Sequence, residues 1–235
     1  MRVFRTIDSL REWRRSVDGS VGFVPTMGAL HPGHRCLMEA AVASNAWALV
    51  SIYVNPTQFN DSVDCSTYPT PLQADLAMCE AAGVSAVFLP DFEGLYPDQY
   101  RFRVQETRDS AILEGRSRPG HFEGMLTVVL KLLILARADR AYFGEKDWQQ
   151  LHLVRGLCEA FLLETQIVPI ETVREADGLA MSSRNTRLSP AARAKASVLN
   201  KVIRGAGSPA EAAEQLVAEG FTVDYVEDWS QRRLA

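Results

Sequence analysis

Two histidines lie at the point where a short apolar strand is expected to give way to a helix. His31 and His34 close the segment Phe23–His34, which reads FVPTMGALHPGH. The apolar run Val21–Pro25 predicts a buried strand, and helical spacing of apolar residues further on predicts a helix from about Pro32. The free amides and the dipole at a helix start favour an anion. The pattern therefore predicts a nucleotide phosphate site, with a zinc pair as the weaker reading because no cysteine or carboxylate has ligand spacing.

A lysine occupies a second corner of the same kind. Lys146 follows the predicted strand Arg140–Phe143 and precedes the predicted helix Trp148–Leu162. An ammonium group at such a corner can pair with triphosphate oxygens, and Gln150, one turn into the helix, would face the same cleft. The alternative is that the two neighbouring carboxylates neutralise Lys146 at the surface.

Two uncharged polar residues follow a third apolar run. Trp47–Val54 is nearly continuous in apolar residues and predicts a parallel strand buried on both faces. In an open α/β sheet, ligands bind beyond the carboxyl ends of the strands. Asn55 and Gln58 lie there, and their amides can both donate and accept, which suits a hydroxy acid. Asn55 has the alternative role of simply making the turn.

Two further segments combine polar residues with irregular structure. Leu113–His121 holds two arginines, a carboxylate and a histidine, and reads either as a lid over an anionic substrate or as a solvated loop. His121 itself is equally consistent with a helix cap or a core histidine. Met181–Asn185 brings two hydroxyls and an arginine together, as a phosphate clamp or as an ordinary loop.

The remaining pattern predicts alternating strands and helices, with loops at Asp61–Thr70 and Asp91–Tyr100. A first helix, Leu10–Val17, is expected to be capped by Asp8 or Ser9. Further strands are expected at Val3–Arg5, Ala86–Pro90, Arg101–Gln105, Ile167–Val173 and Phe221–Val226, and further helices at Leu72–Ala82, Phe122–Ala136, Ser189–Ile203 and Ala210–Ala218.

The composition excludes several classes of protein. The chain has 235 residues, 47% of them hydrophobic, with a net charge of −4, so no global basic field favours a nucleic acid partner. The longest apolar stretch, Leu126–Ala136, is too short to span a bilayer, and the charged N-terminus has no signal-peptide pattern. Four cysteines form no regular framework, which predicts free thiols and a cytoplasmic location.

The polar segments form an ordered series: HPGH, NPTQF, LEGxSRPGHF, GEKDxQQ and MSSRN. In this order they resemble the pantoate–β-alanine ligases, a family within the HIGH/KMSKS nucleotidyltransferases. The resemblance is close over Val21–Leu188 and looser before it. It implies an α/β fold: a Rossmann-like parallel sheet with helices on both faces, over residues 1–172, and a small C-terminal α+β lid domain, over residues 173–235.

The resemblance also implies a reaction and a set of substrates. Pantoate carboxylate attacks the α-phosphorus of ATP, giving pantoyl adenylate and pyrophosphate, and the amine of β-alanine then displaces AMP to give pantothenate. Mg²⁺ is expected on the phosphates, with no assignable protein ligands and Asp75 as the faintest candidate. A homodimer is implied. The alternatives are another nucleotidyltransferase of the same fold or a non-catalytic nucleotide-binding relic.

Roles carry over residue by residue. His31, His34, Lys146 and Arg184 are expected to act in catalysis, with His34 at the position that the family describes as proton donor. Gln58 and Gln150 would bind pantoate, with Gln58 also near β-alanine and Asn55 beside them. The expected ATP contacts are Pro25, Thr26, Met27, Gly28, Ala29, Leu30, His31, Pro32, Gly33, His34, Gly144, Glu145, Lys146, Asp147, Val173, Met181, Ser182, Ser183 and Arg184.

The chain also departs from the family pattern. Thr57 stands where the family commonly has Met, and Arg116 adds a charge to the LEG segment. The chain ends at Ala235, which predicts a shortened C-terminal domain with two helices and one strand.

Overall fold

The computed structural model describes all residues from 1 to 235. The chain divides into two compact units, Met1–Glu171 and Thr172–Ala235, and each is described by itself. No helix of the chain is long and apolar enough to cross a membrane.

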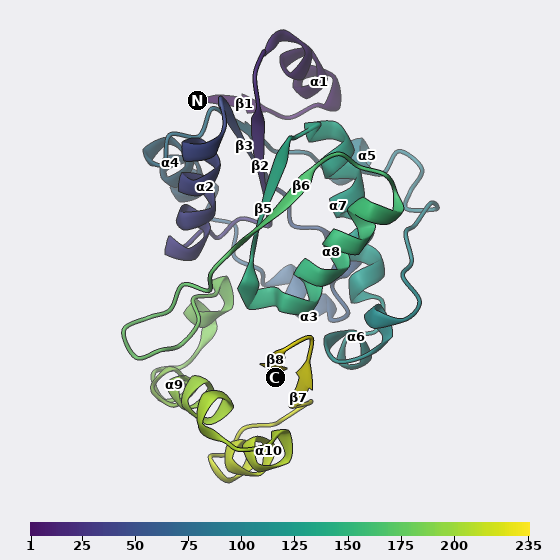
Figure 1. Cartoon of the computed structure of the whole chain (residues 1–235). Coiled ribbons are helices and arrows are strands. Elements are labelled where there is room, and N and C mark those ends of the chain that lie inside the picture. The colour runs from purple at the N-terminus through teal and green to yellow at the C-terminus, as the bar shows by residue number, and fades with distance from the viewer. The chain divides into compact units, whose positions relative to one another are not determined.

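The first unit is built on one six-stranded parallel sheet (Figure 1). Its strand order is β1-β4-β3-β2-β5-β6, so β2 lies at the centre between β3 and β5. Strands β3, β4 and β1 lie on one side of β2, and strands β5 and β6, which come later in the chain, lie on the other side. The strands are β1 (Arg2–Phe4), β2 (Val21–Thr26), β3 (Trp47–Ile52), β4 (Ala86–Phe88), β5 (Arg140–Gly144) and β6 (Gln166–Ile170).

Helices cover both faces of this sheet, as the α/β prediction requires. One face packs on α1, α5, α7 and α8, and the other on α2 and α4. The helices and 3₁₀ turns of this unit are α1 (Ile7–Ser16), α2 (Pro32–Ser44), η1 (Pro56–Gln58), α3 (Ser62–Ser66), α4 (Leu72–Ala81), α5 (Phe92–Leu95), η2 (Asp109–Ala111), α6 (Glu114–Ser117), α7 (His121–Ala136), η3 (Glu145–Asp147) and α8 (Trp148–Ala160).

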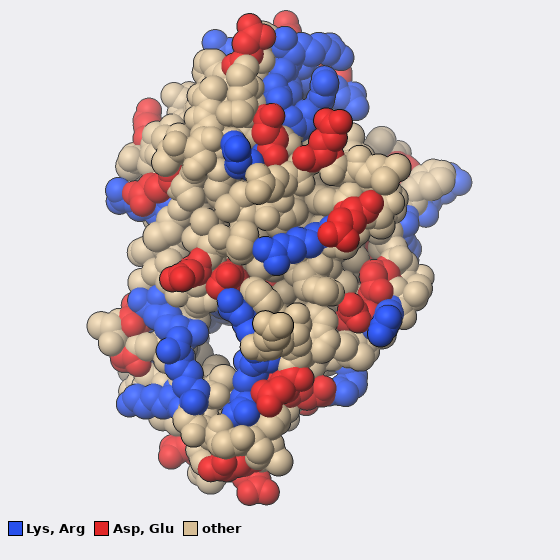
Figure 2. All heavy atoms as spheres, viewed as in Figure 1, with Lys and Arg blue, Asp and Glu red and all other residues tan.

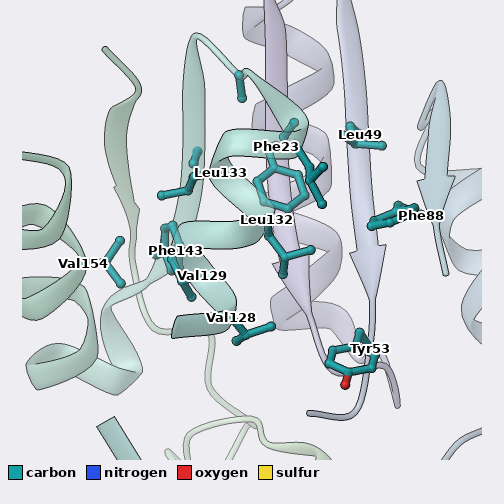
Figure 3. Close-up of a cluster of buried hydrophobic side chains, with 14 of the residues drawn as sticks. Phe23, Leu49, Tyr53, Phe88, Val128, Val129, Leu132, Leu133, Phe143 and Val154 are labelled. Carbon is teal, nitrogen blue, oxygen red and sulfur yellow. The ribbon is translucent and has the colours of Figure 1, made fainter. Parts of the chain in front are cut away.

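The core follows from the alternation of side chains along each strand. On β3, Leu49 joins one buried cluster while Ala48 and Val50 join the cluster on the opposite face. Figure 3 shows the larger cluster, in which Phe23 of β2 and Leu132 of α7 meet between sheet and helix. Both faces are buried, which explains why the central strands are apolar without interruption.

The second unit contains two helices and a small antiparallel sheet. Helices α9 (Pro190–Gly205) and α10 (Pro209–Ala218) pack together, and strands β7 (Glu227–Trp229) and β8 (Arg232–Leu234) pair with each other. A 3₁₀ turn, η4 (Ser183–Arg187), lies before α9. Both helices begin with a serine cap followed by proline. The sequence predicts this start at Ser189 for α9, whereas it predicts α10 only from Ala210.

Some predicted elements are wrong. Residues 101–105 form no strand, because the amides of Phe102 and Val104 donate to side chains, those of Asp98 and Thr127. Residues 221–226 also form no strand, since their apolar side chains pack against the helices of the second unit, and the two strands come later.

Local capping explains the smaller differences. The first helix is capped by Thr6, whose hydroxyl accepts from the amide of Ser9, rather than by Asp8 or Ser9. Asp61 and Asp91 cap the short helices α3 and α5 inside segments that the sequence predicts as loops. These carboxylates each accept one backbone amide, which is enough to close a single helical turn.

The charged side chains of the first unit carry both signs. Figure 2 shows acidic and basic groups interspersed over the visible face, with basic groups gathered over α1, whose last turn holds Arg14 and Arg15.

Candidate active site

The sheet topology brings three polar corners together. Strands β3, β2 and β5 are neighbours in parallel register, so their carboxyl ends meet at one edge of the sheet. The chain after β2 leads to His31 and His34, the chain after β3 leads to Asn55 and Gln58, and the chain after β5 leads to Lys146. The strand order changes direction between β2 and β5, the kind of switch point where open α/β sheets bind their ligands.

The two histidines form a reciprocal cap at the start of α2. The Nδ1 atom of His31 accepts from the amide of Gly33 at 3.1 Å, and the Nδ1 atom of His34 accepts from the amide of His31 at 3.3 Å. Their ring centroids lie 4.0 Å apart. A ring nitrogen that accepts a hydrogen bond is unprotonated, so each neutral ring carries its proton on Nε2. The pair therefore offers two N–H donors.

The surroundings keep both rings neutral. Burial, reinforced by His31 and Lys146, lowers the pKa of His34 to about 3. Burial followed by the charge of Lys146 also lowers the pKa of His31, while Asp147 opposes the shift at both rings. Lys146 and Asp147, at the corner after β5, therefore act on the pKa of both imidazoles at the corner after β2. In the chain alone, His34 is a hydrogen-bond donor rather than an imidazolium.

These shifts predict a pH dependence of stability. An unfolded histidine has a pKa near 6.5. Below about pH 6.5, the histidines of the unfolded chain therefore bind protons, whereas His31 and His34 of the folded chain bind them only at lower pH. The stabilisation present above pH 6.5 is therefore lost progressively as the pH falls toward 3. We expect urea unfolding at pH 5 to give a smaller free energy of unfolding than at pH 7, and His34→Asn to reduce that difference. Equal differences in wild type and variant would contradict the assignment.

A buried carboxylate holds the loop between β2 and α2. Asp75 of α4 is 2% exposed, and its two oxygens accept the amides of Ala29 and Leu30 at 2.9 and 2.7 Å. Gly28 and Ala29 both have left-handed backbone, and a Cβ at Gly28 would come within 3.0 Å of the Asp75 carboxylate. Asp75 is the faintest metal candidate of the sequence, and its geometry instead assigns it to positioning the loop.

Removing one of those acceptors tests this role. Asp75→Asn replaces a carboxylate oxygen with an NH₂ group that cannot accept an amide, so it should cost about 2 kcal/mol of stability, the scale of a hydrogen bond to a charged group. The requirement for ATP should rise as well, because the loop that carries the expected ATP contacts loses its anchor. Thermal unfolding and ATP titration measure both, with the exposed Asp8→Asn as the matched control. A variant that matches this control in both assays would rule out the anchoring role.

Lys146 lies in the 3₁₀ turn that follows β5. Its Nζ atom is 3.1 Å from Asp147, and its side chain is 38% exposed. This pairing matches the alternative in which carboxylates neutralise the lysine. The same ammonium nevertheless acts on the pKa of both histidines. A Cβ added at Gly144, at the end of β5, would meet no atom within 4 Å, which leaves open space at the strand end.

The side chain of Asn55 is fully hydrogen-bonded within the protein. It is 1% exposed, its Nδ2 atom donates to Gln58 and to the Gly124 carbonyl, and its Oδ1 atom accepts from Thr57 and Tyr96. All its hydrogen-bonding capacity is thus used. The structure favours a positioning role for Asn55 over a contact with substrate. Its side chain makes no cap bond at the turn, so it does more than the turn-making that the sequence left open.

The side-chain amide of Gln58 keeps one atom without a hydrogen bond, whereas the side chain of Asn55 keeps none. Its Oε1 atom accepts from Asn55 at 3.1 Å, which orients the amide, and its Nε2 atom makes no hydrogen bond within the protein. Helix α7 lies directly against this turn, since a Cβ at Gly124 would come 2.2 Å from the Thr57 carbonyl oxygen. Only glycine allows this approach, so the position of Gln58 depends on Gly124.

Gln149 was missed by sequence reasoning, which selected only its neighbour Gln150. Gln149 is 5% exposed, and it donates to the carbonyls of Asp109 and Ile112 and accepts the amide of Glu114. It therefore fixes the segment that leads into α6. The only available signal was a glutamine on the apolar side of α8. Gln150 is half-buried on the same helix.

The segment Leu113–His121 is ordered. Arg118 pairs with Glu114 at 3.0 Å and donates to Asn60 at 3.1 Å, and α6 occupies its centre. His121 is 7% exposed, and its ring contacts the carbonyl of Gln58. The segment is a structured turn beside Gln58 rather than a solvated loop.

The second unit holds Val173 and the MSSRN segment. The amide of Met181 donates to the Val173 carbonyl at 3.0 Å, so these expected ATP contacts lie side by side within the unit. Ser182 caps η4 by accepting the amide of Arg184, Ser183 is 9% exposed, and Arg184 is exposed.

The chain has no cluster of side chains placed to bind a metal ion. No group of three or more histidine, cysteine or carboxylate side chains is placed to hold an ion, and both oxygens of Asp75 are taken by amides.

Comparisons with known proteins agree with this fold. The family model for pantoate-β-alanine ligase matches residues 2–235. A pantothenate synthetase of Bdellovibrio bacteriovorus is 51% identical over 232 residues, covering 99% of this chain and 92% of the relative. The pantoate-β-alanine ligase of Francisella tularensis, solved in complex with β-γ ATP and β-alanine, matches with a TM-score of 0.93 at 36% identity, over 100% of this chain and 95% of that one. A pantothenate synthetase structure from Thermus thermophilus matches with a TM-score of 0.88 at 44% identity, over 96% of this chain and 86% of that one.

The fold and the comparisons define an α/β enzyme whose candidate site lies at a switch point of a parallel sheet. The chain belongs to the pantoate–β-alanine ligase family. The chain spans 92% and 95% of the lengths of the Bdellovibrio and Francisella proteins.

Proposed function

We propose that this chain condenses (R)-pantoate with β-alanine to pantothenate, at the expense of ATP, through a pantoyl-adenylate intermediate. The observation that carries the proposal is the donor set at the carboxyl ends of β2, β3 and β5: two neutral imidazole N–H groups, an ammonium whose field reaches both, and the free amide of Gln58. Family membership and the relatives that carry this activity support it.

In the first step, the pantoate carboxylate attacks the α-phosphorus of ATP, and the P–O bond to pyrophosphate breaks. Phosphoryl-type transfer needs positioned donors and cations rather than a protein nucleophile. His31 and His34 would donate to phosphate oxygens through Nε2, and Lys146 would neutralise developing charge. Gln58 and Gln150 would bind pantoate, with Asn55 holding Gln58 in place.

The remaining contacts to ATP are proposed from the family resemblance. The segment Pro25–His34 would line the nucleotide, Gly144–Asp147 would hold ribose and phosphate, and Val173 would contact adenine. Met181–Arg184 would supply further phosphate contacts, with Arg184 acting in catalysis.

Mg²⁺ enters this proposal only as part of the substrate, bound to the phosphates of ATP, because the chain provides no ligand cluster for it. A homodimer is proposed on the family resemblance. Four free cysteines fit a reducing compartment and support a cytoplasmic location.

A release assay tests the proposed reaction. AMP should form when ATP, pantoate and β-alanine are all present, and its formation should fall to background when either pantoate or β-alanine is omitted. AMP release without pantoate, or with unrelated acids in its place, would instead favour another nucleotidyltransferase. ATP binding with no AMP release under any condition would favour a non-catalytic relic.

Substitution of Gln58 tests the substrate assignment. Gln58→Ala removes an oriented amide donor, so the KM for pantoate should rise by roughly 10-fold, about the worth of one net hydrogen bond, while the KM for ATP changes less. Steady-state kinetics with each substrate varied in turn gives both constants. An equal rise in both would remove Gln58 from pantoate binding.

A further inference from the structure

His121 differs from the histidine pair in where its ring proton must lie. It is the first residue of α7, and its Nδ1 atom is 2.8 Å from the carbonyl oxygen of Gln58. A carbonyl oxygen can only accept, so Nδ1 donates and the Nε2 atom of the neutral ring is unprotonated. His121 therefore presents a hydrogen-bond acceptor beside the substrate-binding residue Gln58.

No other histidine can offer such an acceptor in the candidate site. The chain has four histidines. His31 and His34 use Nδ1 to accept backbone amides and carry their protons on Nε2. His152 lies elsewhere on α8, with Nε2 at 3.2 Å from Asp109. The Nε2 atom of His121 makes no hydrogen bond within the protein, and it is not among the fully buried unpaired atoms.

The packing around His121 makes this acceptor rigid. Helix α7 is held against the turn Pro56–Gln58 by two hydrogen bonds, from Asn55 to the Gly124 carbonyl and from His121 to Gln58. The close approach at Gly124 leaves no room for the helix to shift toward the turn. A side chain fixed in this way can hold a proton acceptor in one place.

The charges that face His121 keep its ring neutral. Burial, followed by the nearby Arg118 guanidinium, lowers its pKa. The Gln58 carbonyl, Glu114 of α6 and Asp147 of η3 act in the opposite direction. Asp147 thus acts on the pKa of His121 as well as on those of His31 and His34.

We propose that the Nε2 atom of His121 accepts the proton that the β-alanine ammonium must lose before it can form the amide. The proposal rests on the proposed function and assigns a residue to its second step. The three imidazoles then divide the chemistry: His31 and His34 donate toward the phosphates, and His121 accepts from the nucleophile.

Protons and electrons balance in this step. β-Alanine arrives as an ammonium, and one proton passes to His121 Nε2, which leaves a lone pair on nitrogen. That lone pair forms the C–N bond to the pantoyl carbonyl carbon, while the C–O bond to AMP breaks and its electron pair leaves with the phosphate. The remaining extra proton on nitrogen is released to water as the amide forms, and the imidazolium of His121 returns its proton to water.

His121→Asn separates this role from a purely structural one. Asparagine places an NH₂ donor near the position of Nδ1, so the link to Gln58 can persist, but it has no acceptor at the position of Nε2. We expect β-alanine-dependent pantothenate formation to fall about 100-fold or more, the scale of a lost general base. Pantoate-dependent exchange of pyrophosphate into ATP reports the first step alone and should change far less. The surface variant His152→Asn is the matched control.

Two readouts distinguish a lost base from a distorted site. Hydroxylamine is unprotonated at neutral pH and needs no base, so it should trap pantoyl adenylate in His121→Asn almost as well as in wild type. The deficit with β-alanine should also shrink as the pH approaches about 10, where an alkyl amine loses its proton unaided.

The outcomes of these assays distinguish failure of the His121 proposal from failure of the proposed function. Equal losses with hydroxylamine and β-alanine, or a deficit that does not change with pH, would overturn the assignment of His121 and leave the ligase proposal intact. Wild-type chain without pantoate-dependent exchange would overturn the proposed function itself. If His121→Asn unfolds, His121→Gln with the same two nucleophiles replaces it, and selective loss with β-alanine remains the required result.

Discussion

Lys146→Ala should raise the barrier to adenylate formation by about 2–4 kcal/mol, which is roughly a 30-fold to 1,000-fold loss of rate. The ammonium is the one side-chain cation of the first unit whose field reaches both His31 and His34. Its removal takes away the cation of the first unit that would oppose the charge that develops on the transferring phosphorus. Pantoate-dependent pyrophosphate exchange measures this step without the contribution of β-alanine.

The same variant makes a second, independent measurement possible. Because Lys146 lowers the pKa of His31 and His34, its removal should raise both values, and NMR titration of the imidazoles detects this. The exposed Lys201→Ala serves as the control for a lost lysine. Exchange close to wild type would exclude Lys146 from the mechanism, even if the histidine titrations shift.

His34→Asn should reduce adenylate formation by about 100-fold to 1,000-fold, the range for removing one donor to a developing charge. The asparagine oxygen can still accept the amide of His31, so the cap of α2 survives while the outward N–H is lost. His34→Gln provides the opposite change, since its amide reaches the position of Nε2, and it should retain more activity. Exchange rates and melting temperatures of both variants separate the chemistry from the cap.

Titration distinguishes a hydrogen-bond donor from an acid at this position. A His34 that must be protonated would give the exchange rate a limb that falls as the pH rises through its pKa. With the pKa of His34 held near 3, no such limb is expected between about pH 5.5 and 8. A fall in rate over this range that disappears in His34→Gln would show that His34 acts as an acid.

The parts of the fold that could be predicted depend on local pattern. The strand at Trp47–Ile52 was evident because both faces of a central parallel strand are buried, which leaves an unbroken apolar run. The helix from Pro32 was evident because proline at a first helical position is a strong start signal. The corners that carry His31 and Lys146 follow from these elements.

The parts that could not be predicted depend on contacts distant in sequence. Asp75 meets the amides of Ala29 and Leu30 across 46 and 45 positions of the chain, and no spacing rule reveals such a pair. Gln149 reaches backbone groups about 40 positions earlier for the same reason. The alternatives for His121 could not be separated until the Gln58 carbonyl was seen beside its ring.

Local signals also misled where the tertiary structure used the same residues differently. The alternation at Phe221–Val226 has the period of a strand, but its apolar side chains pack, partly buried, against the core that α9 and α10 form. The side-chain amide of Asn55 could bind a substrate. Four hydrogen bonds within the protein, however, use all of its donors and acceptors.

The most direct test of the central claim is exchange of labelled pyrophosphate into ATP by the wild-type chain with one substrate at a time. If the imidazole donors and Lys146 act together on ATP to activate pantoate, label should enter ATP with pantoate alone and not with β-alanine alone. Exchange that requires β-alanine, or that proceeds without pantoate, would contradict the account.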